Sequence, residues 1–219
     1  MQLQIAERPF ATVFQILGSR KSSEPVELSK PARVLLIAAS LVAAIALSGL
    51  WGLAATSTSL AAAGGNVVKV PILILGSGLA AIPLVVVLWK LVGPPQSSVT
   101  SLLLAYAVAL FGGALLLAVT APIVAIYQYS SSFAGPSIAH LSAVVAFVGF
   151  ALLFVRALRR VSQPGTSKWK LAMPATALLV VQMLAMAQLA SATSPVFKER
   201  TWFGRGVDGM AVPSQVDAP

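Results

Sequence analysis

Long uncharged stretches that are rich in Leu, Val, Ala and Ile dominate the pattern of hydrophobic and polar positions along this chain. They cover Val34–Val68, Val70–Trp89, Leu91–Val155 and Leu171–Phe197. A helix needs roughly 20 apolar residues to cross a hydrocarbon core about 30 Å thick. Because each stretch reaches that length, the pattern predicts an integral membrane protein.

Turn-forming residues divide these stretches into separate helices. The Thr-, Ser-, Ala- and Gly-rich stretch Ala54–Asn66 is typical of a short exposed loop, and Gly93–Ser98 interrupts the next helix. The third stretch is too long for one span, and its break is expected between Tyr127 and Pro136. We therefore predict an all-α polytopic membrane protein, a bundle of five transmembrane helices over residues 34–53, 70–89, 99–127, 137–155 and 171–192.

The N-terminal segment, residues 1–33, contains one amphipathic stretch. In PFATVFQIL, which begins at Pro9, apolar side chains recur at helical spacing, and basic residues follow. An apolar face with a basic end is typical of a helix that lies on an anionic membrane surface. We expect Phe10, Phe14, Arg20 and Lys21 to contact the inner leaflet. The alternative is a helix that docks on a partner protein.

Small and polar residues inside the spans predict how the helices pack. In the first span, a Ser, Ala or Gly recurs every four residues, which forms a strip where another helix can approach closely. Two glutamines in the fifth span are expected to form hydrogen bonds between helices. The predicted packing positions are Ser40, Ala44, Ser48, Gly52, Gly76, Gly112, Gln182 and Gln188. We expect packing within the bundle, with self-association or a partner subunit as the alternative.

Basic residues predict the orientation of the bundle. The chain is 58% hydrophobic and 10% charged, with a net charge of +9. If the N-terminus is cytoplasmic, eleven Lys and Arg lie on that side and four on the other. The positive-inside rule therefore predicts a cytoplasmic segment 1–33 and an extracytoplasmic tail 193–219. Because most of the basic residues sit at span ends, where they act as topological anchors, no nucleic-acid partner is expected.

Residues that could carry catalysis or bind metal are sparse. The chain contains no Cys, which excludes disulfides and thiolate chemistry, and the six acidic residues lie in the tails. Proton relays and ion-coupled carriers need ionisable groups at depth, and none is predicted in the middle of a span. His140 is the single histidine and has no second ligand in the sequence, so we expect no cofactor there. These features argue against an enzyme.

Aromatic and basic residues alternate in the tail, directly after the fifth span. One interpretation is an aromatic and basic belt at the membrane interface. The other is a docking segment for an extramembrane partner. The residues predicted to bind that partner are Phe197, Arg200, Trp202, Phe203 and Arg205.

Several short segments support a resemblance that covers most of the chain. They are PFATVFQILGSRK, Lys69-Val70-Pro71, Ala121-Pro122-Ile123, FVRALRR, and Gln188-Leu189 with the later SPVFKERTWFGRG. With these segments the chain resembles a family of small five-span bacterial membrane proteins, loosely like the Yip1 group. Ala190-Ser191-Ala192 stands where the family tends to have an aromatic residue and an arginine. The resemblance implies a helical bundle in a bacterial inner membrane, without a known activity.

Some members of that family are labelled as containing an actin-binding WH2 motif. The nearest match in this chain is Leu28-Ser29-Lys30-Pro31, whose proline departs from the motif. The label therefore does not guide our functional hypotheses.

Three functional hypotheses follow from these observations. The leading one is a non-catalytic membrane subunit or scaffold that packs through small-residue helix faces and the tail. The second is a facilitator or pore for a small neutral or lipidic solute. The third, implied by the Yip1-like resemblance, is a role in membrane shaping or lipid trafficking. The expected partners are the lipid bilayer and other membrane subunits or a second copy of the chain.

Overall fold

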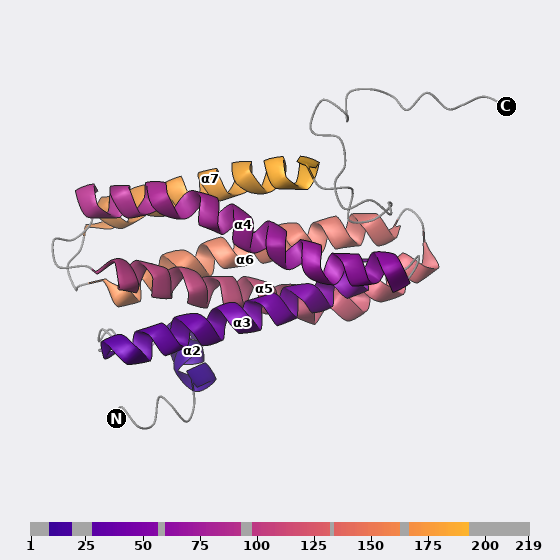
Figure 1. Ribbon diagram of the computed structural model, residues 1–219, viewed down its shortest axis with the longest axis horizontal. Helices are drawn as coiled ribbons and strands as arrows, with labels where there is room; N and C mark the ends of the chain where they lie inside the picture. Colours follow the sequence, from indigo (N-terminus) through magenta and orange to yellow (C-terminus); the bar gives the residue numbers. More distant parts are fainter. Residues whose placement is uncertain are drawn as a thin grey trace.

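The structure is a computed structural model that describes residues 9–18, 28–56, 60–92, 98–131, 134–162 and 167–192. Within these residues the secondary structure is entirely helical. The helices are α2 (Pro9–Gly18), α3 (Lys30–Ala54), α4 (Leu60–Val92), α5 (Val99–Ser130), α6 (Ala134–Val161) and α7 (Lys168–Ala192). Helices α3 to α7 are each long and apolar enough to cross a membrane, and they run in alternating directions (Figure 1). The predicted five-helix bundle is confirmed, and the chain is a multi-pass membrane protein.

Helix α5 is the centre of the bundle. Within the most apolar part of α5, 72% of the residues are buried, compared with 28–33% in the other four long helices. It packs along its length against α3 and α6, which form one layer with it. Helices α4 and α7 pack against each other as a second layer, and α4 crosses from α3 to α7 (Figure 1).

Helix α4 begins at Leu60, well before the predicted span, so that part of the expected loop Ala54–Asn66 is helical. The reason lies in its packing against the end of α3. Asn66 is 2% exposed, and its side-chain amide donates a hydrogen bond to Thr56 Oγ1. At Gly52 a side chain would overlap the Asn66 backbone, so this glycine permits the close approach of the two helices.

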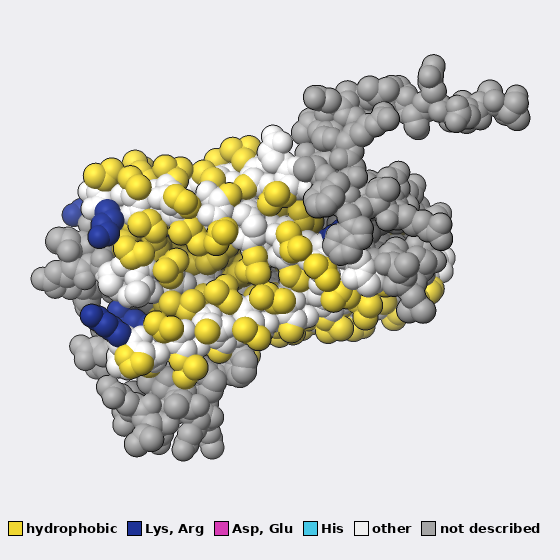
Figure 2. All heavy atoms as spheres, viewed as in Figure 1, with side chains coloured by type: hydrophobic (Ala, Val, Ile, Leu, Met, Phe, Trp, Pro, Cys, Tyr) yellow, Lys and Arg dark blue, Asp and Glu magenta, His cyan; other side chains and the backbone are white. Residues whose placement is uncertain are grey.

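Lys and Arg of the described residues gather at one end of the bundle, which we call the basic end. Figure 2 shows them where α3 begins and α4 ends. Arg33 Nη1 donates to Ser98 Oγ and to Ser101 Oγ, each at 3.2 Å, and so joins the first turn of α3 to that of α5. Lys69 is an exception, because it lies buried in the half of α4 that is remote from this end.

Helix α2 docks on the chain's own bundle, against α3, α5 and α6. Val13 and Ile16 are fully buried there. Phe14 is half exposed, and its ring meets that of Phe111 edge-on, with 5.8 Å between the centroids. The amphipathic helix predicted from the sequence is therefore present, with part of its apolar face covered by this chain itself. The side chain of Phe10, together with Arg20 and Lys21, lies outside the described residues.

Candidate ligand-binding cavity

Near the basic end, the two layers are packed closely together. Trp89, Phe154 and Leu178 from α4, α6 and α7 are each no more than 2% exposed and belong to one core cluster. Tyr106 of α5 meets Phe150 and Phe154 edge-on, with ring centroids 5.8 and 6.4 Å apart. Tyr106, Phe154 and Leu178 line a void of only about 10 Å³. Large side chains therefore fill this half of the interface.

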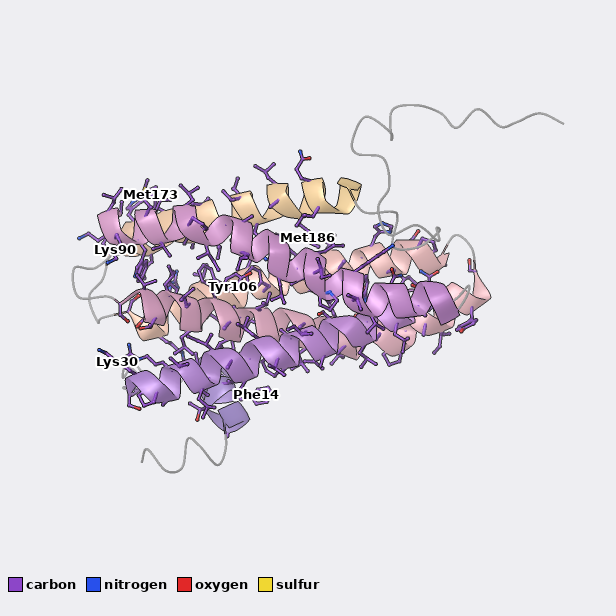
Figure 3. The ribbon with its side chains drawn as sticks, viewed as in Figure 1. Phe14, Lys30, Lys90, Tyr106, Met173 and Met186 are labelled. Carbon is purple, nitrogen blue, oxygen red and sulfur yellow. The ribbon has the colours of Figure 1, made fainter. Side chains whose placement is uncertain are left out.

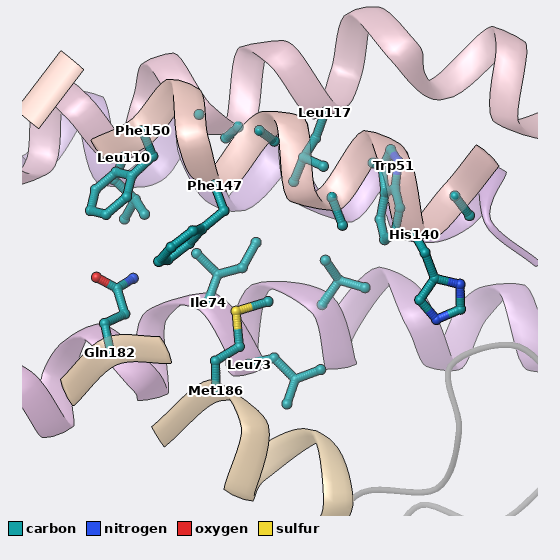
Figure 4. A pocket seen from close by; sticks show the side chains of 16 residues that line it. Trp51, Leu73, Ile74, Leu110, Leu117, His140, Phe147, Phe150, Gln182 and Met186 are labelled. Atoms are coloured by element: carbon teal, nitrogen blue, oxygen red, sulfur yellow. The ribbon is translucent and has the colours of Figure 1, made fainter. Parts of the chain in front are cut away.

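In the half remote from the basic end, the same two layers enclose a cavity of about 230 Å³. Its walls come from α4, α5, α6 and α7, with Trp51 of α3 at one end (Figure 4). Helices α4 and α5 contact each other only over a short stretch, as do α6 and α7. The α4–α5 contact and the α6–α7 contact therefore form two loosely closed seams along the cavity. The cavity is only partly enclosed as a result.

A change of side-chain size along α6 explains where the cavity begins. Ala139, Ala143 and Ala146 line it, and the same helical stripe continues toward the basic end with Phe150 and Phe154. These positions are three or four residues apart, so they lie on one face of the helix. On α5, Gly113 and Ala114 also line the cavity. Small residues from both helices thus leave space beside Phe150, which also lines the cavity, and Phe154 fills the interface further on.

Gln182 of α7 is the buried polar group of the cavity wall. It is 3% exposed and points from α7 toward α5 and α6 (Figure 4). Its Oε1 has no hydrogen-bond partner among the described residues. The hydroxyl of Tyr106 lies close enough to Gln182 to interact with it, yet forms no hydrogen bond of regular geometry within the described part of the chain. A buried polar atom without a partner is unfavourable and uncommon.

The opposite end of the cavity carries Trp51 and His140. Trp51 Nε1 donates to Ser142 Oγ at 3.0 Å, a buried hydrogen bond that ties α3 to α6. His140 is exposed, and its Nδ1 lies 2.6 Å from the carbonyl oxygen of Pro136. Along α6 the lining runs from His140 to Phe150, which is about 15 Å at the rise of an α-helix. The cavity is therefore elongated, with a polar group near each end.

The structure places the predicted packing residues in different environments. Ser40, Ala44, Ser48 and Gly52 are all buried in the bundle. At Gly76 a side chain would touch Leu189 of α7, and at Gly112 it would overlap Leu153 of α6.

Gln182 and Gln188 do not share one face of α7. Gln182 is buried, but Gln188 is exposed on that helix. The reason is that six residues turn an α-helix by roughly one and two-thirds turns. The role predicted for Gln188 in hydrogen bonding between helices stays a prediction. The residues of the tail, Phe197, Arg200, Trp202, Phe203 and Arg205, lie outside the described part of the chain.

Sequence reasoning did not find the cavity or the Tyr106–Gln182 pair. The stripe of Ala followed by Phe on α6 is the signal that could have indicated the cavity. It is visible in the sequence, but its meaning depends on which helices face it. Among the described residues, no group of three or more His, Cys, Asp and Glu is placed to hold a metal ion.

The fold and the cavity define a multi-pass helical membrane protein with an apolar space between its helices. Comparisons with protein-family models, curated proteins and solved structures gave no match to this chain. Its function is therefore inferred from the cavity and from the residues that line it.

Proposed function

We propose that this chain is a non-catalytic membrane protein that holds a lipidic molecule in the cavity between its two helix layers. The observation that carries the proposal is the cavity of about 230 Å³ itself. It exceeds the apolar cavity of roughly 150 Å³ that takes up benzene in a soluble protein. Sites between the helices of a bundle are a common place for apolar ligands.

The composition of the walls supports an apolar occupant over water. Leu73, Ile74, Leu117 and Phe147 present hydrocarbon to the cavity. An ordered water molecule needs two to four polar partners, and apolar cavities generally stay dry. The loosely closed seams give lipid chains a lateral route from the bilayer into this space. A molecule with a hydrocarbon chain therefore fits the walls better than a polar solute.

This proposal develops the second functional hypothesis and ranks it above the scaffold role. Ser40, Ala44 and Ser48, which could have formed a surface for a partner subunit, are buried in this chain. The predicted docking tail lies outside the described residues, so a subunit role stays a prediction. The Yip1-like role in lipid trafficking also stays a prediction, and it is compatible with a lipid-binding cavity.

We further propose a bacterial inner membrane as the location, with the basic end in the cytoplasm. The concentration of Lys and Arg at one end of the described bundle supports this orientation. Because the chain contains no Cys, single cysteines can report it. In intact spheroplasts, a membrane-impermeant maleimide should label Tyr129→Cys and should label Lys90→Cys only after lysis. The reverse pattern would contradict the orientation.

Native mass spectrometry of the chain extracted from its own membrane tests the proposed function. We expect one lipidic molecule per chain. Ala143→Trp, which fills the cavity, should abolish this added mass. Val144→Trp is the matched control, because Val144 is the next residue on α6 and is 59% exposed on its outer face. Retention of the molecule by Ala143→Trp, or loss in both variants, would exclude the cavity as its site.

A further inference from the structure

Apolar walls give the cavity little selectivity in a membrane. Lipid chains are as apolar as Leu side chains, so moving hydrocarbon from the bilayer into the cavity gains little free energy. A hydrogen bond made only with the right ligand can provide the selectivity that hydrocarbon contacts lack. The polar groups at the two ends of the cavity therefore decide which molecule it prefers.

Gln182 is the polar group best placed to select a ligand. Its side chain is 97% buried, and it lies in the wall opposite α5 and α6 (Figure 4). Oε1 of its amide lacks a hydrogen-bond partner among the described residues. An amide oxygen only accepts hydrogen bonds, so a ligand that pairs with it must bring a donor.

The charges around the cavity limit that donor to a neutral group. Among the described residues, no Asp, Glu, Lys or Arg lines the cavity, so a charged ligand group would have no counter-charge beside Gln182. A charge at this depth in a bilayer is unfavourable. The neighbouring Tyr106 hydroxyl is buried against Gly78 of α4 and beside Gln182, and Tyr106 is not among the described residues that line the cavity. A ligand hydroxyl is neutral and can donate a hydrogen bond, which suits Gln182 Oε1.

We propose that the cavity selects a neutral lipidic alcohol whose hydroxyl donates to Gln182 Oε1. The hydrocarbon chain of this alcohol runs along α6 toward Trp51. The inference rests on the proposed function, because it names the class of lipidic molecule that the same cavity prefers. The length of the lining on α6, about 15 Å between His140 and Phe150, accommodates one extended chain in this direction.

Quenching of Trp51 fluorescence by bromine tests whether binding requires the ligand hydroxyl. It also tests the direction in which the hydrocarbon chain of the ligand runs. Trp51 becomes the only tryptophan in the full chain with substitutions Trp89→Phe, Trp169→Phe and Trp202→Phe. This variant in lipid nanodiscs is titrated with decanol that carries bromine on its terminal carbon. The matching methyl ether, which has lost the donor, is titrated in parallel. With the hydroxyl at Gln182, the bromine of the alcohol lies near Trp51 and quenches it.

We expect the alcohol to bind about threefold to tenfold more tightly than the ether, the range that one hydrogen bond between groups in a membrane provides. Gln182→Leu should remove this preference. Met183→Leu is the matched control, because Met183 is the adjacent residue on α7 and is 55% exposed. It should retain the preference of the parent protein.

The outcomes separate this inference from the proposed function. Equal affinity for alcohol and ether in the parent protein would overturn the inference and leave the cavity as a lipid site. A preference that survives in Gln182→Leu would also overturn it. Absence of quenching by both probes, with native fluorescence and thermal unfolding retained, would overturn the inference, because no bound probe then places its bromine near Trp51. The native mass spectrometry of Ala143→Trp and Val144→Trp tests the proposed function independently of this result. If Gln182→Leu fails to fold, the comparison of alcohol and ether affinities in the parent protein still tests the inference.

Discussion

The two halves of the interface between the helix layers differ although the same four helices build them. In the half near the basic end, which Lys30 and Lys90 mark in Figure 3, Trp89, Phe154 and Leu178 are almost completely buried. The void that Phe154 and Leu178 line there is about 10 Å³. In the remote half, Ala139 and Ala143 stand at the corresponding positions of α6, and the void is about 230 Å³. The opening is therefore set by side-chain size within a shared backbone arrangement.

This difference indicates that the two halves of the bundle have different roles. Large buried side chains contribute dispersion contacts that hold the layers together. Small residues along the remote half give up part of that packing and create space for another molecule. Stability should therefore respond strongly to substitutions in the packed half and weakly in the open half. The amount of bound ligand should respond strongly to substitutions in the open half and weakly to substitutions in the packed half.

The largest effect is expected from Trp89→Ala in the packed half. Trp89 is 2% exposed, and truncating a buried aromatic side chain leaves a cavity that costs about 3–5 kcal/mol of unfolding free energy. Trp169→Ala is the control, because Trp169 is 82% exposed. Reversible unfolding in mixed micelles with increasing SDS measures both values. Similar losses in the two variants would contradict the assignment of Trp89 to the packed core.

An intermediate effect is expected from Gly78→Ala. The Tyr106 hydroxyl occupies the notch that Gly78 leaves on α4, and an added methyl group would overlap it. Overpacking of this kind costs about 1–3 kcal/mol, against which the better helix propensity of Ala recovers up to about 1 kcal/mol. Tyr106→Phe in the Gly78→Ala background should restore part of the lost stability. Additive effects of the two substitutions in SDS unfolding would show that the residues do not meet.

The smallest effect is expected in the open half, from Trp51→Phe. This substitution removes the hydrogen bond to Ser142 and retains most of the aromatic ring. Hydrogen bonds between membrane helices contribute about 0.6 kcal/mol on average. A double-mutant cycle with Ser142→Ala should give a coupling energy of that size. A coupling energy of about 3–5 kcal/mol, the loss of unfolding free energy expected for Trp89→Ala, would contradict a weakly held open half.

The sequence predicted the number of spans correctly because hydropathy and span length are local properties. It placed the start of α4 too late because Ala, Gly and Asn near Asn66 resemble a loop. That segment is helical where Asn66 packs on Gly52 of α3 and donates a hydrogen bond to Thr56, which follows the end of α3. Local composition carries no information about such a contact, so the error has a tertiary origin.

The candidate site was only partly predictable for the same reason. Gln182 was selected from the sequence as a hydrogen-bonding residue within the bundle, but its position beside a cavity depends on the separation of α4 and α7 from α5 and α6. Tyr106 was not selected, because a tyrosine in an apolar span has no distinctive pattern. The Tyr106 hydroxyl packs against Gly78 of α4 and lies beside Gln182 of α7, and both neighbours depend on how the helices are arranged.

An experimental density map of the chain in lipid nanodiscs is the most direct test of the contrast between the two halves. It should show elongated density that is not protein between Ile74, Phe147 and Met186, and continuous side-chain density around Trp89 and Phe154. Closure of the remote half by protein side chains, with no space between α4 and α7 on one side and α5 and α6 on the other, would contradict the account.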